Sequence, residues 1–362
     1  MPKEHIGVGI IGCGRIFDMH MLGYEGRDDA SVVAVADISE ESRCGRAERY
    51  GIPWHYFDYR ELLENRNVDL VEILTPHHLH LEMAVAAAEA GKHISLQKPP
   101  ALNVAEMDEI IAAAEKAGVT LRIYENFVFY PPIVKAKELI EEGAVGTPLN
   151  IRMRSVGGSA AGGWEVPLEA WAWRIDEKTC GGGPFVFDDG FHKFSIALYL
   201  LGEVEKVFCW MEAMHMGEGL CVDAPSICIW KHKEGTRFGS IDFAWAYDMY
   251  IKSDYYSADD RVEVTGTEGI LWVTRGHGNM LDVPPLLLYR EGKLTAYTVL
   301  EADWGASFRD CTRHLLDAMR EGTAPHLTPP EGRRVLQFAL AAITSAREGR
   351  EVRPDDINGG GA

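Results

Sequence analysis

The stretch I-G-V-G-I-I-G-C-G-R-I-F, residues 6–17, joins a short apolar run to a turn rich in glycine. Its first six residues are typical of a buried strand, and Gly12 and Gly14 follow at once. In a strand–turn–helix unit, the first glycine makes the tight turn and the second lets the backbone approach a pyrophosphate. An overlapping match at Gly7, Gly9 and Gly12 is set aside, because there is no room for a strand before Gly7.

Asp37 stands about 20 positions beyond this turn, at the end of a second apolar run, S-V-V-A-V-A-D. A carboxylate there can accept hydrogen bonds from both hydroxyls of an adenosine ribose and would repel a 2′-phosphate. Asp37 can also cap a helix that begins in S-E-E-S, and the two roles are compatible. Phe17 stands where a third small residue is usual, so the match is imperfect. The pattern predicts a dinucleotide site that prefers NAD over NADP.

The first third of the chain alternates short apolar runs with helical patterns. Strands separated by helices of this length indicate βαβ units and a parallel sheet. The expected strands are residues 6–11, 31–37, 68–74, 92–96 and 119–124, with helices near 81–90 and 104–117. We therefore expect an α/β domain over residues 1–125, with the doubly wound parallel sheet of a Rossmann fold.

The pattern changes from residue 126 on. A helix is expected over residues 132–142, and longer runs that alternate polar and apolar residues follow it at 149–155, 204–211, 226–231 and 237–245. Such alternation is typical of an antiparallel sheet with one covered face. The sequence predicts a second, α+β domain over residues 126–362, with an open and mostly antiparallel sheet.

Composition limits the kind of protein. A chain of 362 residues is expected to form two domains, and 46% apolar with 25% charged residues is ordinary for a globular protein. The net charge of −19 argues against binding nucleic acid or an anionic membrane surface. Seven cysteines without C-x-x-C spacing favour a reduced compartment. With no apolar leader and no apolar run of about 18 residues, we expect a cytoplasmic protein.

A lysine stands at the end of the apolar run I-S-L-Q-K-P-P-A, residues 94–101. Pro99 and Pro100 cannot donate to a sheet ladder, so they end the strand and fix the backbone just beyond Lys98. A solvated lysine at a strand exit needs no such support, although the alternative that Lys98 is only a solvated surface residue stays open. A lysine that must aim its ammonium at a reacting atom does need it.

Asp188 and His192 lie four residues apart in G-G-G-P-F-V-F-D-D-G-F-H-K-F, residues 181–194. On a helix this spacing places both side chains on one face, where the carboxylate can orient and charge-stabilise the imidazole. The alternative is that Asp188 or Asp189 caps the helix and that His192 belongs to the core.

These motifs, in this order, resemble the glucose-fructose oxidoreductase, inositol dehydrogenase and MocA family, written Gfo/Idh/MocA. The resemblance rests on G-C-G-R-I, V-A-D, L-T-P-H-H-L-H, A-G-K-H-I-S-L-Q-K-P, N-F-V-F-Y-P, W-R-I-D-E-K-T-C-G-G-G and D-D-G-F-H. It implies NAD or NADP bound in an N-terminal Rossmann domain, and oxidation or reduction of a sugar, polyol or related carbonyl compound. It also implies a homodimer or homotetramer formed through the C-terminal sheet.

The resemblance also implies a set of site residues. The catalytic residues would be Lys98, Asp188 and His192. The cofactor would be held by Gly12, Gly14, Arg15, Ile16, Asp37, Thr75, Pro76, His80, Gln97, Lys98 and Arg174. Substrate contacts would come from Tyr124, Asn126, Trp173, Asp188 and His192. Three positions depart from the family pattern: Gln97 replaces a usual glutamate, Phe17 replaces a small residue, and Phe127-Val128 occupies a stretch where an arginine is common.

The expected enzyme is an NAD-dependent sugar or polyol dehydrogenase of the EC 1.1.1 type. His192 would take the hydroxyl proton and Lys98 would stabilise the charge on the oxygen, although in some relatives the lysine is itself the base. Trp164, Trp171 and Trp173 are candidates for stacking on a sugar. His77, His78 and His80 have no acidic or cysteine partner at ligand spacing, so no metal site is expected.

Two alternatives stay open. One is an enzyme that holds NAD tightly and oxidises a glycoside only transiently, so that elimination breaks the glycosidic bond. The other is a dinucleotide sensor without catalysis, against which the retention of Lys98, Asp188 and His192 argues.

Overall fold

The computed structural model describes residues 4–159, 163–164, 168–215 and 221–358. These residues form two compact units. The first contains residues 4–126 and 308–336, and the second contains residues 127–307 and 337–358. Among the described residues, no helix has both the length and the apolar character that a membrane crossing requires.

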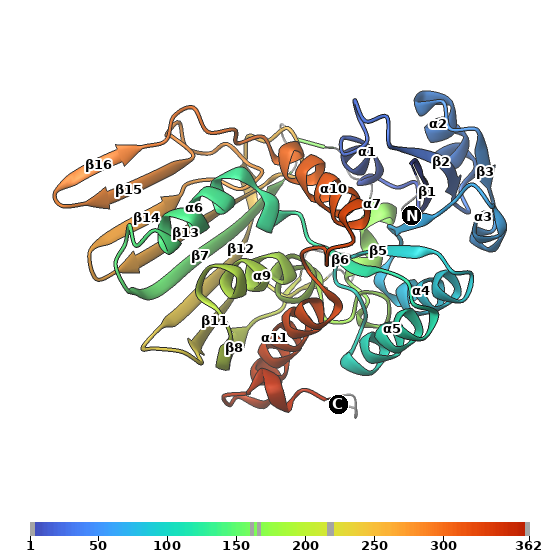
Figure 1. Cartoon of the computed structure of the whole chain (residues 1–362). Coiled ribbons are helices and arrows are strands. Elements are labelled where there is room, and N and C mark those ends of the chain that lie inside the picture. Colours follow the sequence, from blue (N-terminus) through green and yellow to red (C-terminus); the bar gives the residue numbers. More distant parts are fainter. Residues whose placement is uncertain (1–3, 160–162, 165–167, 216–220, 359–362) are drawn as a thin grey trace. The chain divides into compact units, whose positions relative to one another are not determined.

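The first unit is built on a parallel sheet (Figure 1). Within the described residues its strand order is β3-β2-β1-β4-β5-β6, and every neighbouring pair is parallel. The strands are β1 (Ile6–Ile11), β2 (Ala30–Ala36), β3 (Trp54–Tyr56), β4 (Leu70–Ile73), β5 (His93–Gln97) and β6 (Leu121–Tyr124). In this order β2 and β3 lie on one side of β1, and β4, β5 and β6 lie on the other, which confirms the doubly wound Rossmann sheet.

Helices follow the strands of the first unit in alternation. They are α1 (Phe17–Met21), α2 (Glu40–Tyr50), α3 (Tyr59–Glu64), the 3₁₀ turn η1 (His77–Leu79), α4 (His80–Glu89) and α5 (Val104–Ala117). Local sequence explains the ends of α5, because Asn103 accepts the backbone N–H of Glu106 and Gly118 ends the helix at φ +67°. In Figure 1, α4 and α5 lie side by side next to β5.

Two long helices near the C-terminus belong to both units. They are α10 (Trp304–Glu321) and α11 (Pro329–Glu348), and a unit boundary falls inside each. Leu315 and Leu316 of α10 pack into the apolar core of the first unit. The Arg122 guanidinium, which is fully buried, donates to the Cys311 carbonyl at 2.7 Å. The last strand of the parallel sheet is therefore completed by a helix nearly 200 residues further along the chain.

The second unit carries a large mixed sheet. Within the described residues its order is β16-β15-β14-β13-β7-β12-β11-β8, and only the β7–β12 pair is parallel. The strands are β7 (Pro148–Ser159), β8 (Val204–Met211), β11 (Ser226–His232), β12 (Phe238–Tyr250), β13 (Ala258–Gly266), β14 (Gly269–Val273), β15 (Leu286–Arg290) and β16 (Lys293–Ala296). A separate pair joins β9 (Met214–His215) to β10 (Cys221–Val222). The open, mostly antiparallel sheet is confirmed.

Helices cover one face of this sheet, and in Figure 1 α6 and α9 lie in front of it. The helical segments are η2 (Phe127–Phe129), α6 (Pro131–Glu141), α7 (Leu168–Trp171), η3 (Ala172–Arg174), α8 (Glu177–Cys180), the π-helical η4 (Pro184–Asp189), α9 (Gly190–Leu201) and η5 (Pro354–Asp356). The ring of Phe194 on α9 lies 4.3 Å from that of Phe338 on α11, and both rings contact Trp230. These apolar contacts hold α9, and with it His192, against the sheet.

Candidate active site

The glycine turn after β1 has one crowded and one open position. Gly12 has φ +102°, and a Cβ there would stand 3.0 Å from the backbone of Leu74, so a side chain is excluded. A Cβ on Gly14 would meet nothing within 4 Å. The protein therefore leaves open space over Gly14, where a pyrophosphate can approach the backbone.

Asp37 directly follows β2 and fixes this turn. One carboxylate oxygen accepts the backbone N–H of Cys13 at 2.7 Å, and the other accepts that of Ser39 at 2.8 Å. Ile38 beside it is 79% exposed. Because a carboxylate oxygen can accept more than one hydrogen bond, both oxygens keep capacity for the ribose hydroxyls of a bound dinucleotide. The residues present thus fit NAD.

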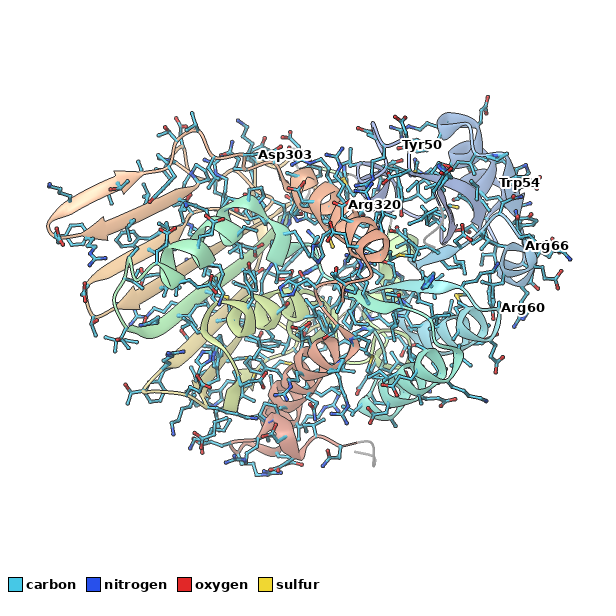
Figure 2. The ribbon with its side chains drawn as sticks, in the orientation of Figure 1. Tyr50, Trp54, Arg60, Arg66, Asp303 and Arg320 are labelled. Atoms are coloured by element: carbon cyan, nitrogen blue, oxygen red, sulfur yellow. The ribbon has the colours of Figure 1, made fainter. Side chains whose placement is uncertain are left out.

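Phe17, the departure from the glycine pattern, is fully buried at the start of α1. Its ring belongs to the core cluster and lies 5.8 Å from the ring of Tyr50, which Figure 2 labels at the end of α2. The short helix α1 is therefore held by a large apolar side chain instead of by a close glycine contact. Arg15 is exposed and Ile16 is half-buried in the same turn.

His80 ties together two loops at the carboxyl end of the sheet. Its Nε2 lies 2.9 Å from the carbonyl oxygen of Thr75, and its Nδ1 lies 3.0 Å from that of Pro99. Burial lowers the pKa of His80 to about 4, against the opposing effect of these carbonyls. The neutral ring carries one N–H and so donates to one of these carbonyls, while its other nitrogen lies against the second; the ring thus bridges the Thr75 turn and the Pro99 loop that follows Lys98. Pro76 lies half-buried at the start of η1.

Lys98 directly follows β5, and its peptide is held by the side chain before it. The backbone N–H of Lys98 donates to Gln97 Oε1 at 2.8 Å. The Gln97 amide nitrogen lies 3.1 Å from Nε2 of His20, and Nδ1 of His20 lies 2.7 Å from a carboxylate oxygen of Glu72. Both His20 and Glu72 are completely buried. Tyr24 donates its hydroxyl to the other oxygen of Glu72 at 2.8 Å.

The hydrogen-bond donors around His20 determine which of its ring nitrogens carries the proton. Because Gln97 Oε1 accepts an N–H, its NH₂ group must face His20 and donate to Nε2. The ring proton therefore sits on Nδ1 and is donated to Glu72. A glutamate in place of Gln97 would set a second carboxylate against the same imidazole. The glutamine is thus matched to a neutral His20, to which it donates.

Two residues expected near the substrate are buried, and Tyr124 lies in the interior of the first unit. Tyr124 is buried, its ring lies 4.0 Å from that of His20, and its hydroxyl bonds the Phe308 carbonyl and Thr312 at 3.1 Å. Asn126 is 2% exposed.

In the second unit, Asp188 lies in η4 and bonds an arginine. Its Oδ2 accepts a hydrogen bond from Nε of Arg174 at 2.7 Å, and the guanidinium also stacks on Trp173 at 4.3 Å. Asp223 accepts the backbone N–H groups of Phe185 and Val186, and so anchors the start of η4. Trp173 and Arg174, predicted for substrate and cofactor, are therefore joined to the predicted catalytic carboxylate.

His192 lies in the first turn of α9 and is 8% exposed. Its ring is 4.7 Å from the ring of Phe127. The ammonium of Lys193 also lies over the Phe127 ring, 4.3 Å from the ring centroid. Lys193 donates to Asp260 at 2.8 Å and lies 3.2 Å from Asp189. Burial opposes the charge, but the two carboxylates raise the pKa of Lys193 to about 12.

Aromatic rings gather beside Phe127. The Trp304 ring lies 6.2 Å from that of Phe127, and Trp164 and Tyr255 lie 6.3 and 5.1 Å from Trp304. The Tyr255 hydroxyl donates to Asp303, which Figure 2 labels at the start of α10. Residues 160–162 and 165–167, on either side of Trp164, lie outside the described residues.

Sequence reasoning missed His20, Glu72, Lys193 and Asp260. Glu72 carried a usable signal, because it is a carboxylate in the middle of the apolar run V-D-L-V-E-I-L. A buried charge on a central strand requires partners, and these are His20 and Tyr24. Asp260 carried no such signal, since its partner Lys193 is 67 residues away in the sequence.

Comparison with known families agrees with this arrangement. Residues 6–125 match the GFO_IDH_MocA family, described as "Oxidoreductase family, NAD-binding Rossmann fold". Residues 133–272 match the "GFO/IDH/MocA C-terminal domain". The two matches cover both the parallel sheet and most of the mixed sheet.

Similar proteins span nearly the whole chain. Myo-inositol 2-dehydrogenase of Thermotoga maritima is 29% identical, over 97% of this chain and 99% of that protein. The scyllo-inositol 2-dehydrogenase (NAD(+)) of Bacillus subtilis is 26% identical, over 98% and 97%. The fold is similar to that of an oxidoreductase from Agrobacterium radiobacter solved with NAD⁺, L-tartaric acid and magnesium, with a TM-score of 0.85, 19% identity and coverage of 98% and 100%.

Proposed function

Because this chain belongs to the Gfo/Idh/MocA family of NAD-binding oxidoreductases, we propose that it is an NAD-dependent dehydrogenase of a sugar, polyol or glycoside. The observation that carries the proposal is the open space over Gly14 beside the Asp37 carboxylate, which suits a dinucleotide without a 2′-phosphate. The inositol dehydrogenases that it resembles support a polyhydroxylated substrate. The net charge of −19 fits a small-molecule substrate better than a nucleic acid.

The chain's own residues must remove one proton from the substrate hydroxyl. Gly12, Gly14 and Asp37 would hold NAD, whose nicotinamide would supply the hydride acceptor for the reaction. In this proposal His192 accepts the hydroxyl proton, and Lys98 donates a hydrogen bond to the oxygen as its negative charge develops. Asp188, which holds Arg174, stabilises the imidazolium that forms. Gln97 and His80 act behind Lys98 and position its backbone, through the Lys98 N–H and the Pro99 carbonyl, while Thr75 lies at the turn that His80 ties down.

The test is NADH formation at 340 nm with a panel of polyols, aldoses and glycosides, with NAD and NADP in parallel. We expect steady turnover with NAD and a loss of at least about 100-fold in Lys98→Met. Lys116→Met, at an exposed position in the last turn of α5, is the control and should keep full activity. Glycoside cleavage without net NADH, by protein that retains NAD on purification, would replace this proposal with transient oxidation and elimination.

We further propose that the protein self-associates, as a homodimer or homotetramer, through the uncovered face of the mixed sheet. Trp210 and Phe238 are 59% and 57% exposed on β8 and β12, and Ile227 on β11 stands directly opposite Trp210. Apolar side chains gathered on neighbouring strands are typical of a surface that another protein covers.

A further inference from the structure

Asp223 is a partly buried carboxylate that binds the start of a distant helical segment. It lies between β10 and β11, and its own carbonyl accepts the Ser226 hydroxyl at 3.1 Å. Its Oδ1 accepts the backbone N–H of Phe185 at 2.9 Å, and its Oδ2 accepts that of Val186 at 2.6 Å. Because hydrogen bonds to an ionised group are stronger than neutral ones, this carboxylate is a firm anchor for η4.

The first turn of η4 depends on an acceptor from elsewhere in the chain. The first N–H groups of a helix have no acceptor inside it. Pro184 stands first and has no N–H, so the next two residues, Phe185 and Val186, present theirs. The residue before the helix, Gly183, has no side chain that could cap them. Asp223, which lies 38 residues beyond Phe185, therefore serves as the N-cap of η4.

The glycine before η4 makes room for this carboxylate. Gly183 has φ +106°, a backbone conformation that disfavours any side chain. A Cβ there would stand 2.9 Å from Cγ of Asp223 and 3.0 Å from each of its carboxylate oxygens. A side chain at this position would push the carboxylate away from η4. The third glycine of the sequence G-G-G is thus required by the contact with Asp223.

The π-helical form of η4 sets the direction in which Asp188 points. The backbone N–H of Asp188 donates to the carbonyl of Gly183, five residues earlier, at 3.1 Å, and that of Gly190 bonds the Phe185 carbonyl in the same way. Such turns are rare, and they are frequent at functional sites. Successive residues of an α-helix are turned by about 100°. Return to an α-helical turn would therefore rotate Asp188 by about 100° and break its 2.7 Å bond with Arg174.

His192 is held independently of this turn. It lies at the start of α9, and the α9 ring of Phe194 packs 4.3 Å from that of Phe338 on α11. This contact involves neither η4 nor the carboxylate of Asp223. A change in η4 would therefore displace Asp188 and leave the imidazole where it is.

We propose that Asp223 is a positioning residue of the active site. By capping η4 it holds the π-helical turn, and with it the Asp188 carboxylate, in the orientation that reaches Arg174 and that the proposed mechanism requires for His192. Asp223 acts through Asp188 and is not itself a catalytic residue. The inference rests on the proposed function and deepens it, because it assigns the support of the carboxylate that stabilises the imidazolium.

The decisive variant is Asp223→Asn, which keeps the shape of the side chain but has only one oxygen to accept the two N–H groups. The kcat for polyol oxidation should fall by at least about tenfold, while KM for NAD stays at the wild-type value, because the proposed dinucleotide residues lie elsewhere. A lower melting temperature with wild-type kcat would overturn the inference and leave the dehydrogenase proposal intact.

The matched control is Asp58→Asn. Asp58 caps α3 by accepting the backbone N–H of Arg60 at 2.9 Å, and it belongs to no proposed site. The same substitution there should lower the melting temperature and leave kcat unchanged.

A double variant tests the route through Asp188. Because Asp223 acts by orienting that carboxylate, adding Asp223→Asn to Asp188→Asn should lower kcat by less than about twofold further. A further tenfold loss would show that Asp223 affects catalysis by another route, and would reject the positioning role.

Wild-type protein that forms no NADH from any polyol would instead overturn the proposed function. The hold on η4 is then measured by hydrogen–deuterium exchange, which needs no turnover. Residues 185–189 should exchange at least about tenfold faster in Asp223→Asn, while residues 194–201 exchange as in wild type. Equal exchange of residues 185–189 in both proteins rejects the inference.

Discussion

The backbone N–H of Lys98 donates to the side-chain oxygen of Gln97 at 2.8 Å. Gln97 in turn donates to His20, and His20 to the completely buried Glu72. The peptide of the proposed catalytic lysine is thus the outer end of a hydrogen-bond chain that begins in the core of the first unit. Such chains fix a side chain's starting point to within the tolerance that catalysis needs.

We expect Gln97→Met and His20→Phe each to lower kcat by roughly tenfold, because both release the Lys98 peptide. Since both break one chain, the double variant should lose little more than either single variant. Steady-state kinetics measures this, and NADH binding by fluorescence should change little. Tyr24→Phe, which removes only the second bond to Glu72, is the control. Fully additive losses would show that the chain does not act as a unit.

Asp37→Ala should raise KM for NAD and improve the ratio of kcat/KM for NADP over NAD by at least about tenfold, because the carboxylate that repels a 2′-phosphate is removed. It should also lower stability by roughly 1–2 kcal/mol, since the N–H groups of Cys13 and Ser39 lose their acceptor. Asp58→Ala, which removes a helix cap at α3, should lower stability alone. Equal coenzyme ratios in both variants would rule out the ribose role.

The buried His80 predicts a loss of stability on mild acidification. Its pKa is lowered by burial from 6.5 to about 4, so below pH 6.5 the unfolded chain takes up a proton that the folded chain refuses. The free energy of unfolding should therefore fall as the pH drops from 6.5 toward 4, by up to ~3 kcal/mol from this residue. Denaturant melts of wild type and His80→Gln across that range isolate the effect. A constant difference between the two proteins would contradict it.

Trp210→Asp on the uncovered sheet face should reduce the molar mass measured by light scattering to that of a monomer, because a buried unpaired charge opposes association. Val299→Asp is the matched control, since Val299 is 100% exposed and lies outside the strands. We expect it to leave the mass unchanged. A Trp210→Asp protein with the wild-type mass would place the self-association surface elsewhere.

Local pattern was sufficient for the regular parts of the first sheet. The expected strand 6–11 coincides with β1, and the expected helix 104–117 coincides with α5, because apolar periodicity and end signals agree there. The edge strand β3 was missed, since it has three residues and its Trp54 is 39% exposed. The long β12 runs to Tyr250, five residues beyond the expected strand.

Long-range pairs could not be predicted from the sequence. Lys98 was identified by its prolines, but its support comes from His20 and Glu72, whose side chains meet only when β1, β4 and β5 pair. Asp188 was predicted beside His192 from a regular helical spacing, whereas the segment that carries it is π-helical and its carboxylate bonds Arg174. Local spacing does not report such partners, since they depend on tertiary packing.

The way the chain returns to its first unit affects how the protein is made. Tyr124 and Arg122 on β6 find their partners in Phe308, Cys311 and Thr312. When the first 126 residues have emerged from the ribosome, the strands of the parallel sheet are all present, but the last strand, β6, still lacks its covering helix. That sheet can be completed only after residues 127–307 of the second unit have been synthesised, and until then β6 is an uncovered edge of the kind that favours aggregation.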